Sequence, residues 1–311
     1  MKTQAMQPAN PSLRGVLRRN EPMARHVTWR AGGAARAFYQ PADVQDLSAF
    51  LPTLPADEPV LFVGLGSNLL VRDGGFDGTV VFTHHALTGI ADVPALAPKV
   101  GVVAGAGVPA PHVARFVARR SGAGAEWMAG VPGTVGGALA MNAGCYGGET
   151  WNHVVSVKTI GRDGTVREQG PAEFEVSYRH VRARSGSDSW FVSATLAFEP
   201  GDEAMAMAGM KALLVKRVAA QPLNQPNAGS VFRNPPGDHA ARLIESCGLK
   251  GLRRGAAQVS AKHANFIVNL GGATAADIEG LIDQVQATVR ERTGVELVRE
   301  VRVVGKEPAH G

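Results

Sequence analysis

The amino-acid sequence predicts an α+β fold built from two units. The first half contains short apolar runs of strand type that glycines interrupt, such as residues 60–64 and 100–103. After Pro200 and Gly201 the pattern changes to longer helical segments. Strands and helices do not alternate regularly, as they would in a doubly wound parallel sheet. A chain of 311 residues also suits about two domains of ordinary size.

The first half supplies mostly strands. We expect strands at residues 60–64, 78–82, 100–103, 154–160, 165–168 and 190–198, and a helix at residues 111–120 that ends before Gly122. The run Gly161-Arg-Asp-Gly164 predicts that the strands on either side of it form a hairpin.

The second half is richer in helix. We expect helices at residues 203–219, 239–246 and 275–292, and strands at residues 266–270 and 295–304. The helix at residues 275–292 has the clearest boundaries. Thr274 is a candidate N-cap with Asp277 three residues later, and Gly294 follows the helix end.

The composition favours a globular protein that binds small anions. Apolar residues make up 45% of the chain, which is enough to build hydrophobic cores. The net charge of +5 suits diphosphate and carboxylate ligands. Lys and Arg are scattered and few aromatic residues lie between them, so we expect no nucleic-acid partner.

Cysteine content and hydropathy favour a cytoplasmic protein. Cys145 and Cys247 are too few for a disulfide framework or a cysteine zinc site, so we expect a reducing compartment and no bound metal. The segment after Lys2 lacks the apolar region of a signal peptide. No apolar run reaches the about 20 residues of a membrane span, so we expect no membrane partner.

The first of two glycine-rich loops covers residues 64–75 and follows a strand. Its glycines allow backbone N–H groups to turn toward phosphate oxygens, and Ser67 and Asn68 add side-chain donors. A plain glycine-rich turn between two strands is the alternative. The third glycine of the dinucleotide fingerprint and the Gly-Lys-Ser/Thr of a Walker loop are both missing.

The second glycine-rich loop covers residues 130–144. Thr134 is placed to cap a short helix, whose N-terminus offers donors and a positive dipole end to a diphosphate or a flavin edge. The alternative is a helix whose small residues allow close packing against a neighbour. Two such loops in one chain favour an extended dinucleotide over a single phosphate group.

The two loops resemble those of a known family. The runs Gly66-Ser-Asn-Leu-Leu-Val, Gly130-Val-Pro-Gly-Thr-Val-Gly-Gly-Ala and Met141-Asn-Ala-Gly are similar to the FAD-binding half of UDP-N-acetylenolpyruvoylglucosamine reductases. That family has the vanillyl-alcohol-oxidase (PCMH-type) FAD-binding fold of two subdomains, followed by a C-terminal α+β substrate-binding domain. One departure is Leu65, where the family often has glycine. A backbone contact tolerates leucine there if its φ angle is negative.

The resemblance implies a division of the chain and a set of cofactor contacts. We expect a flexible tail (1–20), an FAD-binding domain (21–200), a substrate-binding domain (201–305) and a second tail (306–311). The residues implied to bind non-covalent FAD are Gly64, Gly66, Ser67, Asn68, Leu69, Gly130, Pro132, Gly133, Thr134, Gly136, Gly137, Asn142 and Ala143. The tyrosine-bearing insertion of longer members is missing, so the chain is similar to the shorter subgroup.

Residues 227–235, Asn-Ala-Gly-Ser-Val-Phe-Arg-Asn-Pro, form the sharpest motif of the second half. A loop serine most often hydrogen-bonds its own backbone, and the Gly-x-Ser-x-Gly nucleophile elbow is not present. The run nevertheless resembles the serine motif of the family. This resemblance implies that Ser230 is the proton donor to a substrate carbon and that Asn234 contacts the substrate.

Two charged sites gain a role from the same resemblance. The polar pair Tyr178 and Arg179 would otherwise be solvated, but it is similar to a family motif whose arginine stabilises an enolate bidentately and whose tyrosine contacts substrate. Glu300 and Arg302, which alternation places on one strand face, would otherwise be a surface pair. The family implies a protonated, catalytic Glu300 and a substrate-orienting Arg302. Arg299 stands where the family often has proline.

Two further basic residues lie in family-like stretches. Arg217 is assigned to the substrate diphosphate or carboxylate, and a charge that complements a helix C-terminus explains it nearly as well. His263, in residues 260–269, is given no catalytic role.

The resemblance implies a complete reaction. NADPH reduces FAD and leaves, and UDP-N-acetylglucosamine enolpyruvate then takes its place. The flavin delivers hydride to the vinyl carbon, Ser230 protonates the neighbouring carbon, and the product is UDP-N-acetylmuramate for peptidoglycan synthesis. We expect the enzyme to be a monomer. The rivals are an oxidase of the same fold, whose Arg-Ser-Gly-Gly-His-type attachment loop is missing here, and a catalytically silent FAD or sugar-nucleotide binder.

Overall fold

The computed structural model describes residues 5–6, 13–186 and 188–308. Spatial contacts divide the chain into two compact units, each formed by three segments. The first unit contains Met1–Arg19, Phe38–Gly64 and Thr79–Lys216, and the second contains Asn20–Ala37, Leu65–Gly78 and Arg217–Gly311. The chain therefore passes between the units several times. These units are defined by spatial contacts and not by function. The predicted boundary between an FAD-binding and a substrate-binding domain near residue 200 therefore stays a prediction.

The larger sheet of the first unit is antiparallel, with strand order β13-β12-β16-β8-β7 and β9 also paired to β16. Its strands are β7 (Ile90–Asp92), β8 (Val100–Gly105), β9 (Gly122–Ala123), β12 (Val154–Gly161), β13 (Val166–Gln169) and β16 (Ser189–Pro200). Every second residue of β16 from Val192 to Phe198 is buried, as alternation requires. The predicted hairpin of β12 and β13 is confirmed.

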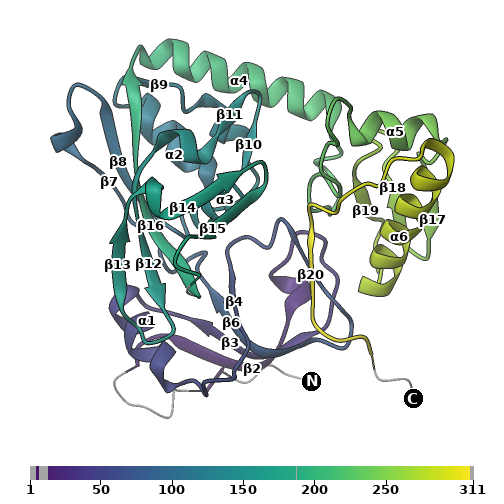
Figure 1. Cartoon of the computed structure of the whole chain (residues 1–311), viewed down its shortest axis with the longest axis horizontal. Helices are drawn as coiled ribbons and strands as arrows, with labels where there is room; N and C mark the ends of the chain where they lie inside the picture. Colours follow the sequence, from purple (N-terminus) through teal and green to yellow (C-terminus); the bar gives the residue numbers. More distant parts are fainter. Residues whose placement is uncertain (1–4, 7–12, 187, 309–311) are drawn as a thin grey trace. The chain divides into compact units, whose positions relative to one another are not determined.

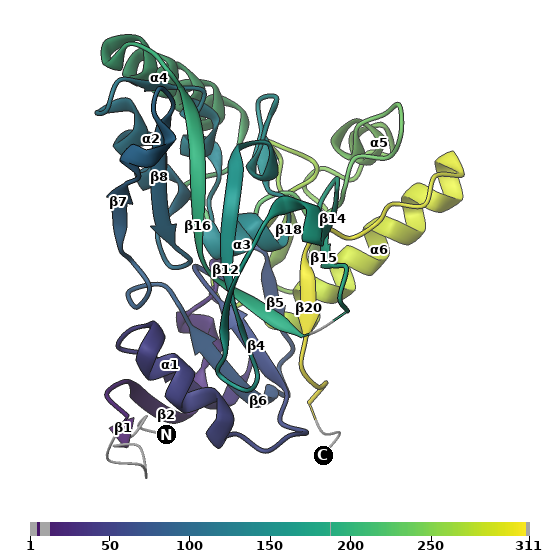
Figure 2. The same ribbon diagram turned by 60° about the vertical axis from the view of Figure 1, so that its left-hand side comes forward.

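Two helices share a hydrophobic core with this sheet (Figure 2). They are α2 (Ala110–Ala118) and α3 (Val135–Ala140). Val113 and Val117 of α2 and Leu139 of α3 are fully buried in that core. The remaining elements of the unit are β10 (Gly144–Cys145), β11 (Gly148–Glu149), β14 (Phe174–Ser177), β15 (His180–Ala183), η3 (Pro94–Leu96), η4 (Glu126–Gly130), η5 (Thr150–His153) and η6 (Pro171–Glu173).

A second sheet has strand order β1-β2-β3-β6-β4. Its strands are β1 (Ala5–Met6), β2 (Val16–Pro22), β3 (Ala34–Gln40), β4 (Val60–Val63) and β6 (Phe76–Phe82), and η1 (Met23–Arg25), α1 (Val44–Phe50) and η2 (Leu51–Thr53) lie between them along the chain. Strands β1 and β2 occupy parts of the segment where the N-terminal tail was expected. Residues 1–4 and 7–12 of that tail, and residues 309–311 of the second tail, lie outside the described residues.

The second unit has its own core around helix α6 (Ala275–Thr293). The expected capping box of Thr274 and Asp277 is present, and Gly294 ends the helix with a φ of 73°. Helix α5 (Ala240–Ser246) and the antiparallel strands β17 (Arg253–Arg254), β18 (Ala257–Val259) and β19 (Ile267–Asn269) complete this core. Helix α4 (Glu203–Ala220), the long helix at the upper edge of Figure 1, buries only Ala206 and Met210.

The last strand is shorter than the sequence suggested. Only Arg302–Val304 forms β20, which pairs in parallel with β5 (Leu69–Val71). The N–H groups of Glu300 and Val301 both point to the carbonyl of Val231, at 2.8 and 3.4 Å. Glu300 therefore lies outside β20, and the strand predicted at residues 295–304 is wrong for residues 295–301. The expectation that Glu300 and Arg302 share a face stays a prediction.

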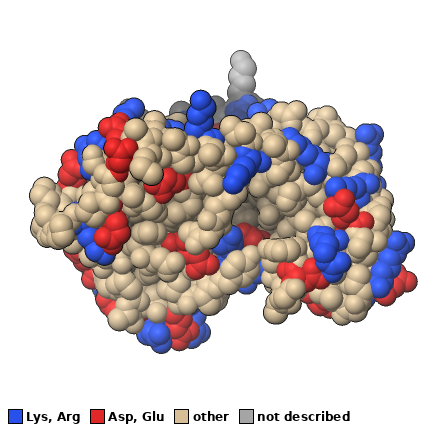
Figure 3. Space-filling model, turned by 90° about the horizontal axis from the view of Figure 1, so that it is seen from above, with Lys and Arg blue, Asp and Glu red and all other residues tan. Residues whose placement is uncertain are grey.

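Charge is spread rather than gathered on the face shown in Figure 3, where basic and acidic side chains are interspersed among uncharged ones. None of the helices in the described ranges combines the length and apolar content of a membrane span.

A buried carboxylate organises the start of the first unit. Asp46 of α1 is only 3% exposed and accepts hydrogen bonds from the Tyr39 hydroxyl at 2.6 Å, the Ala42 N–H at 2.9 Å and the Arg14 N–H at 2.7 Å. Burial opposes ionisation of Asp46, but these donors outweigh it and hold the pKa of the carboxyl below its ordinary value. Burial, with the hydrogen bond to Asp46, raises the pKa of Tyr39.

We expect Asp46→Asn to lower the free energy of unfolding by about 2–3 kcal/mol at pH 7, because buried donors lose a charged acceptor. A depressed folded-state pKa gives stability that is present above the ordinary value of 3.8 and is lost as pH falls through the folded-state value. The difference between wild type and variant in urea unfolding should therefore shrink below about pH 4. Asp43→Asn, which removes an exposed ion pair with Arg14, is the control and should lose less. Equal losses for the two variants at pH 7 would contradict this account.

Candidate cofactor and catalytic site

The two predicted loops meet in the first unit at Gly64 and Thr134. Gly64 follows strand β4, and a Cβ atom added to it would lie 2.2 Å from the Thr134 Oγ1. No side chain fits in that space, so glycine is required where the first loop contacts the second.

Thr134 occupies the N-cap position of α3, as expected, but its hydroxyl does not cap the helix. The Thr134 Oγ1 is buried and has no hydrogen-bond partner among the described residues. The first N–H groups of α3 are already engaged, since Val135 donates to the Val108 carbonyl at 2.8 Å and Gly136 to the Ala106 carbonyl at 2.9 Å. The helix therefore does not offer these two expected donors to a phosphate. The unsatisfied hydroxyl is the polar group that a ligand would satisfy.

Close packing explains part of the glycine content of the second loop. A Cβ on Gly136 would lie 2.9 Å from the Ala106 Cβ, and one on Gly130 would lie 2.8 Å from the Cys145 Sγ. At Gly137 the nearest atom would be 3.9 Å away, so the chain itself does not require glycine there. Pro132 and Gly133 lie between these positions, directly before Thr134.

Asn142 fixes the end of the second loop. Its side chain is 2% exposed, its φ is 41°, and its amide donates to the Glu149 Oε2 at 3.0 Å while its oxygen accepts from the Trp151 N–H at 3.1 Å. The N–H of Ala143 donates to the Ala138 carbonyl at 2.8 Å. These bonds make Asn142 a support for the loop, and a cofactor contact by Asn142 or Ala143 stays a prediction.

Arg179 is held against that same loop end. Tyr178 and Arg179 form the two-residue turn between β14 and β15, and Arg179 has a φ of 56°. The Arg179 guanidinium donates to the carbonyls of Asn142 at 3.1 Å and Gly144 at 2.7 Å, and its Cζ lies 4.9 Å from the centre of the half-exposed Tyr178 ring. Arg179 is therefore anchored rather than simply solvated, which suits a residue that must hold an anion in place.

Residues 65–75 of the first loop belong to the second unit, where they hydrogen-bond the C-terminal segment. Gly66 has a φ of 60°, and a Cβ there would lie 2.3 Å from the His26 carbonyl oxygen. Leu65 does not have a positive φ, which is the condition for tolerating leucine at this position. The Asn68 amide donates to the Glu300 carbonyl at 3.1 Å, and the Asn68 carbonyl accepts from the Arg302 N–H at 3.1 Å. Ser67 precedes Asn68, and Leu69 begins β5.

Ser230 lies in a loop that is anchored on both sides. The Asn227 side chain accepts from the Gly229 N–H at 2.9 Å and donates to the Gln225 carbonyl at 2.8 Å. On the other side, the Asn265 side chain both accepts from and donates to the backbone of Phe232, at 2.9 and 2.8 Å. Across the described part of the chain, no group hydrogen-bonds the Ser230 hydroxyl, so the self-bonded turn serine is not what the structure shows.

The Ser230 loop and Glu300 are neighbours. The Glu300 N–H donates to the carbonyl of Val231, the residue after Ser230, at 2.8 Å. The Glu300 carbonyl in turn accepts from Asn68. The structure therefore brings three predicted site residues, Ser230, Asn68 and Glu300, to one junction of the second unit.

The structure places three residues that were predicted to contact the substrate. The Asn234 oxygen accepts from the N–H of Ala240 at the start of α5, at 3.1 Å. Arg217 lies in the last turn of α4 and its Nε donates to Gln221 at 2.9 Å, in keeping with the helix-terminus alternative. Arg302 is exposed at the start of β20. Their substrate contacts stay predictions.

The structure also singles out residues that the sequence analysis did not assign. Arg233, three residues after Ser230, has a buried Nε with no partner among the described residues. Its place within the serine motif was the available signal. His263 stays without a catalytic role: burial lowers the pKa of its ring, which packs 4.7 Å from Phe266. The described residues contain no cluster of His, Cys, Asp and Glu suited to hold a metal.

Comparisons with known proteins agree on one family. Residues 35–170 match a family model described as an FAD binding domain, and residues 221–304 match one described as the UDP-N-acetylenolpyruvoylglucosamine reductase C-terminal domain. The chain is 56% identical over 292 residues to the UDP-N-acetylenolpyruvoylglucosamine reductase of Alkalilimnicola ehrlichii, covering 94% of this chain and 96% of that protein. It is 53% identical over 305 residues to that of Thiobacillus denitrificans, covering 95% and 94%.

A solved structure shows the same architecture. The crystal structure of UDP-N-acetylenolpyruvylglucosamine reductase from Thermus caldophilus is similar with a TM-score of 0.76 and 29% identity, covering 97% of this chain and 99% of that chain. The expected α+β FAD-binding fold is thereby confirmed. These relatives are reductases, so they do not support the rival oxidase interpretation. The chain belongs to the UDP-N-acetylenolpyruvoylglucosamine reductase family and is an FAD-dependent oxidoreductase.

Proposed function

We propose that this chain reduces the enolpyruvyl group of UDP-N-acetylglucosamine enolpyruvate, with NADPH as reductant and non-covalent FAD as cofactor. The product is UDP-N-acetylmuramate, a peptidoglycan precursor. The observation that supports the catalytic part is the hydrogen bond from the Glu300 N–H to the Val231 carbonyl, because it holds the backbone of Glu300 beside the residue that follows Ser230 in the chain's second unit. The names of the relatives support the same reaction.

The residues of the first loops fit a nucleotide cofactor. In the first unit, the Thr134 hydroxyl is buried, has no hydrogen-bond partner in the described part of the chain, and lies against Gly64, where a side chain is excluded. A phosphate or ring oxygen of FAD would satisfy that hydroxyl. In the second unit, the positive φ of Gly66 turns the backbone ahead of Ser67 and Asn68. We assign these residues, with Leu69 and the second loop from Gly130 to Ala143, to FAD binding.

The proposed roles follow from what each catalytic group can do. FAD held by the residues of the two loops would supply the hydride that reduces the vinyl group of the substrate. The Ser230 hydroxyl gives a proton to the neighbouring carbon, which bears the carboxylate, and so completes the addition of one hydride and one proton across the double bond. The anchored Arg179 guanidinium stabilises the negative charge that develops on the enolate and carboxylate. Glu300, as a protonated acid, donates a hydrogen bond to the same charge.

We also propose that the enzyme works as a monomer in the cytoplasm, with no nucleic-acid or membrane partner. Support comes from its two cysteines, which form no disulfide among the described residues, as a reducing compartment favours, and from the interspersed charge of Figure 3. Tyr178, Arg217, Asn234 and Arg302 are proposed to contact the substrate.

Replacing Ser230 with Ala separates the two halves of the reaction. We expect NADPH to reduce the bound flavin of Ser230→Ala at close to the wild-type rate, because the hydroxyl acts only on the second substrate. Reoxidation by the enolpyruvyl substrate should slow by about 10²–10⁴-fold, the usual range for a general acid. Stopped-flow absorbance of the flavin measures both steps.

Ser246→Ala is the matched control for Ser230→Ala, since the Ser246 hydroxyl donates to the Leu243 carbonyl of its own helix. Both steps should stay at wild-type rates in this variant. Unchanged reoxidation in Ser230→Ala would remove Ser230 from its role.

Replacing Thr134 with the isosteric Val tests the cofactor assignment. Because the Thr134 hydroxyl has no partner within the described chain, we expect Thr134→Val apoprotein to melt at or above the wild-type temperature. Its affinity for FAD should fall by about 5- to 10-fold, which corresponds to the loss of about 1 kcal/mol from one hydrogen bond. Flavin fluorescence titration and thermal melting measure the two effects.

Thr159→Val is the inverse control, because the Thr159 hydroxyl donates to the Gln169 side chain at 2.7 Å. This variant should lose stability and keep its FAD affinity. If Thr134→Val instead lowers the melting temperature and leaves FAD affinity intact, the hydroxyl serves the fold and not the cofactor.

A further inference from the structure

We propose that Glu279 of helix α6 is a positioning residue for Glu300, and that it acts through Arg299. The inference rests on the proposed function, because it assigns Glu279 to the site that contains Glu300. The printed contacts of Glu279 are with Arg72 and Arg299, so its proposed role is one of position and not of direct chemistry.

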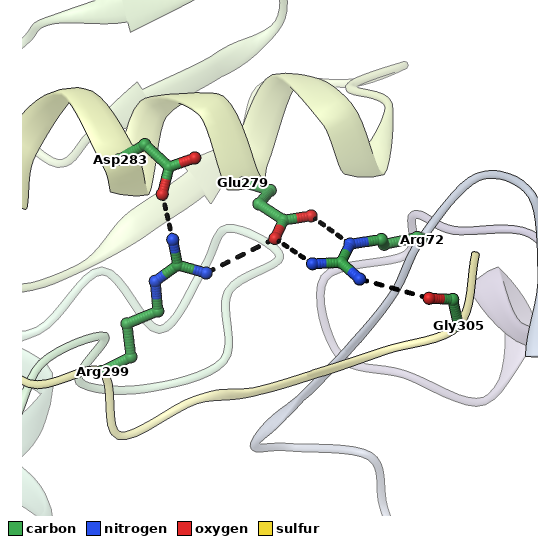
Figure 4. Close-up of polar contacts among 5 residues, drawn as sticks. All are labelled: Arg72, Glu279, Asp283, Arg299 and Gly305. Carbon is green, nitrogen blue, oxygen red and sulfur yellow. Dashed lines mark hydrogen bonds and ion pairs between the residues drawn. The ribbon is translucent and has the colours of Figure 1, made fainter. Parts of the chain in front are cut away.

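Glu279 binds two arginines at once (Figure 4). The Arg72 Nε and Nη2 donate to the two Glu279 oxygens at 2.8 Å each, which is a bidentate pair, and the Arg72 Nη1 donates to the Gly305 carbonyl at 3.3 Å. The Arg299 Nη1 donates to the Glu279 Oε1 at 3.4 Å, and the Arg299 Nη2 contacts Asp283 one helical turn along α6. Helix α6 therefore clamps the backbone before Glu300 through a side chain.

The clamp is charge-balanced and partly buried. Two guanidinium groups face two carboxylates, and the side chain of Glu279 is only 15% exposed, against 34% for Arg72 and 29% for Arg299. The hydrogen bonds from Arg72 hold the pKa of Glu279 below its ordinary value, although burial opposes this. Glu279 is thus ionised at neutral pH. Without its charge, two guanidinium groups would face each other with only Asp283 left, and Arg299 would move.

The backbone around Glu300 shows why this clamp matters. Phe232 and Arg299 form an isolated antiparallel bridge, in which Arg233 donates to the Val298 carbonyl and Glu300 donates to the Val231 carbonyl. The Arg299 N–H takes no part in these bonds. Glu300 is therefore held by its own peptide groups on one side and by the Arg299 side chain on the other.

Arg299 directly precedes Glu300, so a restraint on Arg299 limits where the backbone of Glu300 can lie. A proline ring restrains the backbone covalently by locking φ near −65°, whereas an arginine does not. In this chain the ion pairs of Arg299 with α6 supply a restraint through the side chain instead. Because the Arg299 N–H is not needed in the bridge, a proline at this position would cost no bridge hydrogen bond.

The test compares Glu279→Gln with wild-type holoenzyme, using FAD, NADPH and UDP-N-acetylglucosamine enolpyruvate. We expect FAD affinity and flavin reduction by NADPH to change less than about threefold, while flavin reoxidation by the substrate slows by about 10- to 100-fold, the range for a misplaced catalytic group. The effect should fall on kcat more than on KM, because Glu279 does not touch the substrate.

Glu296→Gln is the matched control. It removes an ion pair between the same helix and the same C-terminal segment, but the Arg290–Glu296 pair is 3.7 Å long and its side chains are 65% and 62% exposed. We expect wild-type kinetics in both half-reactions for this variant.

A rescue experiment separates positioning from general stability. In the Glu279→Gln background, Arg299→Pro should restore reoxidation to within about threefold of wild type, since the ring replaces the lost clamp. Arg299→Ala in the same background should not restore it. Thermal melting of each holoenzyme accompanies the kinetics.

The inference is overturned if Glu279→Gln behaves like Glu296→Gln, or if it slows both half-reactions equally and lowers the melting temperature without rescue by proline. Failure of the proposed function is a separate result: in that case Ser230→Ala would turn over the enolpyruvyl substrate as fast as wild type. If Ser230→Ala is slow and Glu279→Gln is not, only the positioning role of Glu279 is lost.

Discussion

The structure of the second unit depends on one backbone hydrogen bond, from the N–H of Glu300 to the carbonyl of Val231. It joins the C-terminal segment to the serine loop, and the next bond along, from Asn68 to the Glu300 carbonyl, adds the first glycine-rich loop. The backbone of Glu300 therefore joins the C-terminal segment to two segments that lie far from it in sequence. In the proposed mechanism, these hydrogen bonds fix the backbone of Glu300 before the substrate arrives.

Backbone groups also hold a proposed site residue in the first unit. The turn that carries Arg179 donates to the carbonyls of Asn142 and Gly144, so the guanidinium is fixed by the loop that the sequence assigns to the cofactor. Thr134 contributes the opposite feature, a buried hydroxyl without a hydrogen-bond partner among the described residues. A charged, oxygen-rich cofactor needs side chains that are held in place, as Arg179 is, and polar groups that can still accept a partner, such as the Thr134 hydroxyl.

Elements with local signals were predictable from sequence. Helix α6 begins and ends where Thr274, Asp277 and Gly294 indicate, because capping depends on residues within one turn. The short extent of the last strand was not predictable, because Glu300 and Val301 both donate to the carbonyl of Val231, which lies about seventy residues earlier in the chain. Strand β3 was missed for a different reason: Phe38 and Tyr39 are consecutive and both buried, so no period of two is visible.

The site was predictable in identity more than in geometry. Resemblance pointed to Ser230, Arg179 and Glu300, and the sequence alone gives no means of knowing that Asn68 donates to Glu300 or that α6 clamps Arg299. Thr134 was expected as a helix cap, a role its hydroxyl does not fill.

The most direct test of the account is the visible flavin absorbance of the wild-type protein incubated with FAD. NADPH should bleach it without oxygen, and UDP-N-acetylglucosamine enolpyruvate should then restore it. A protein that stays colourless, or a reduced flavin that this substrate does not reoxidise, would contradict the assignment.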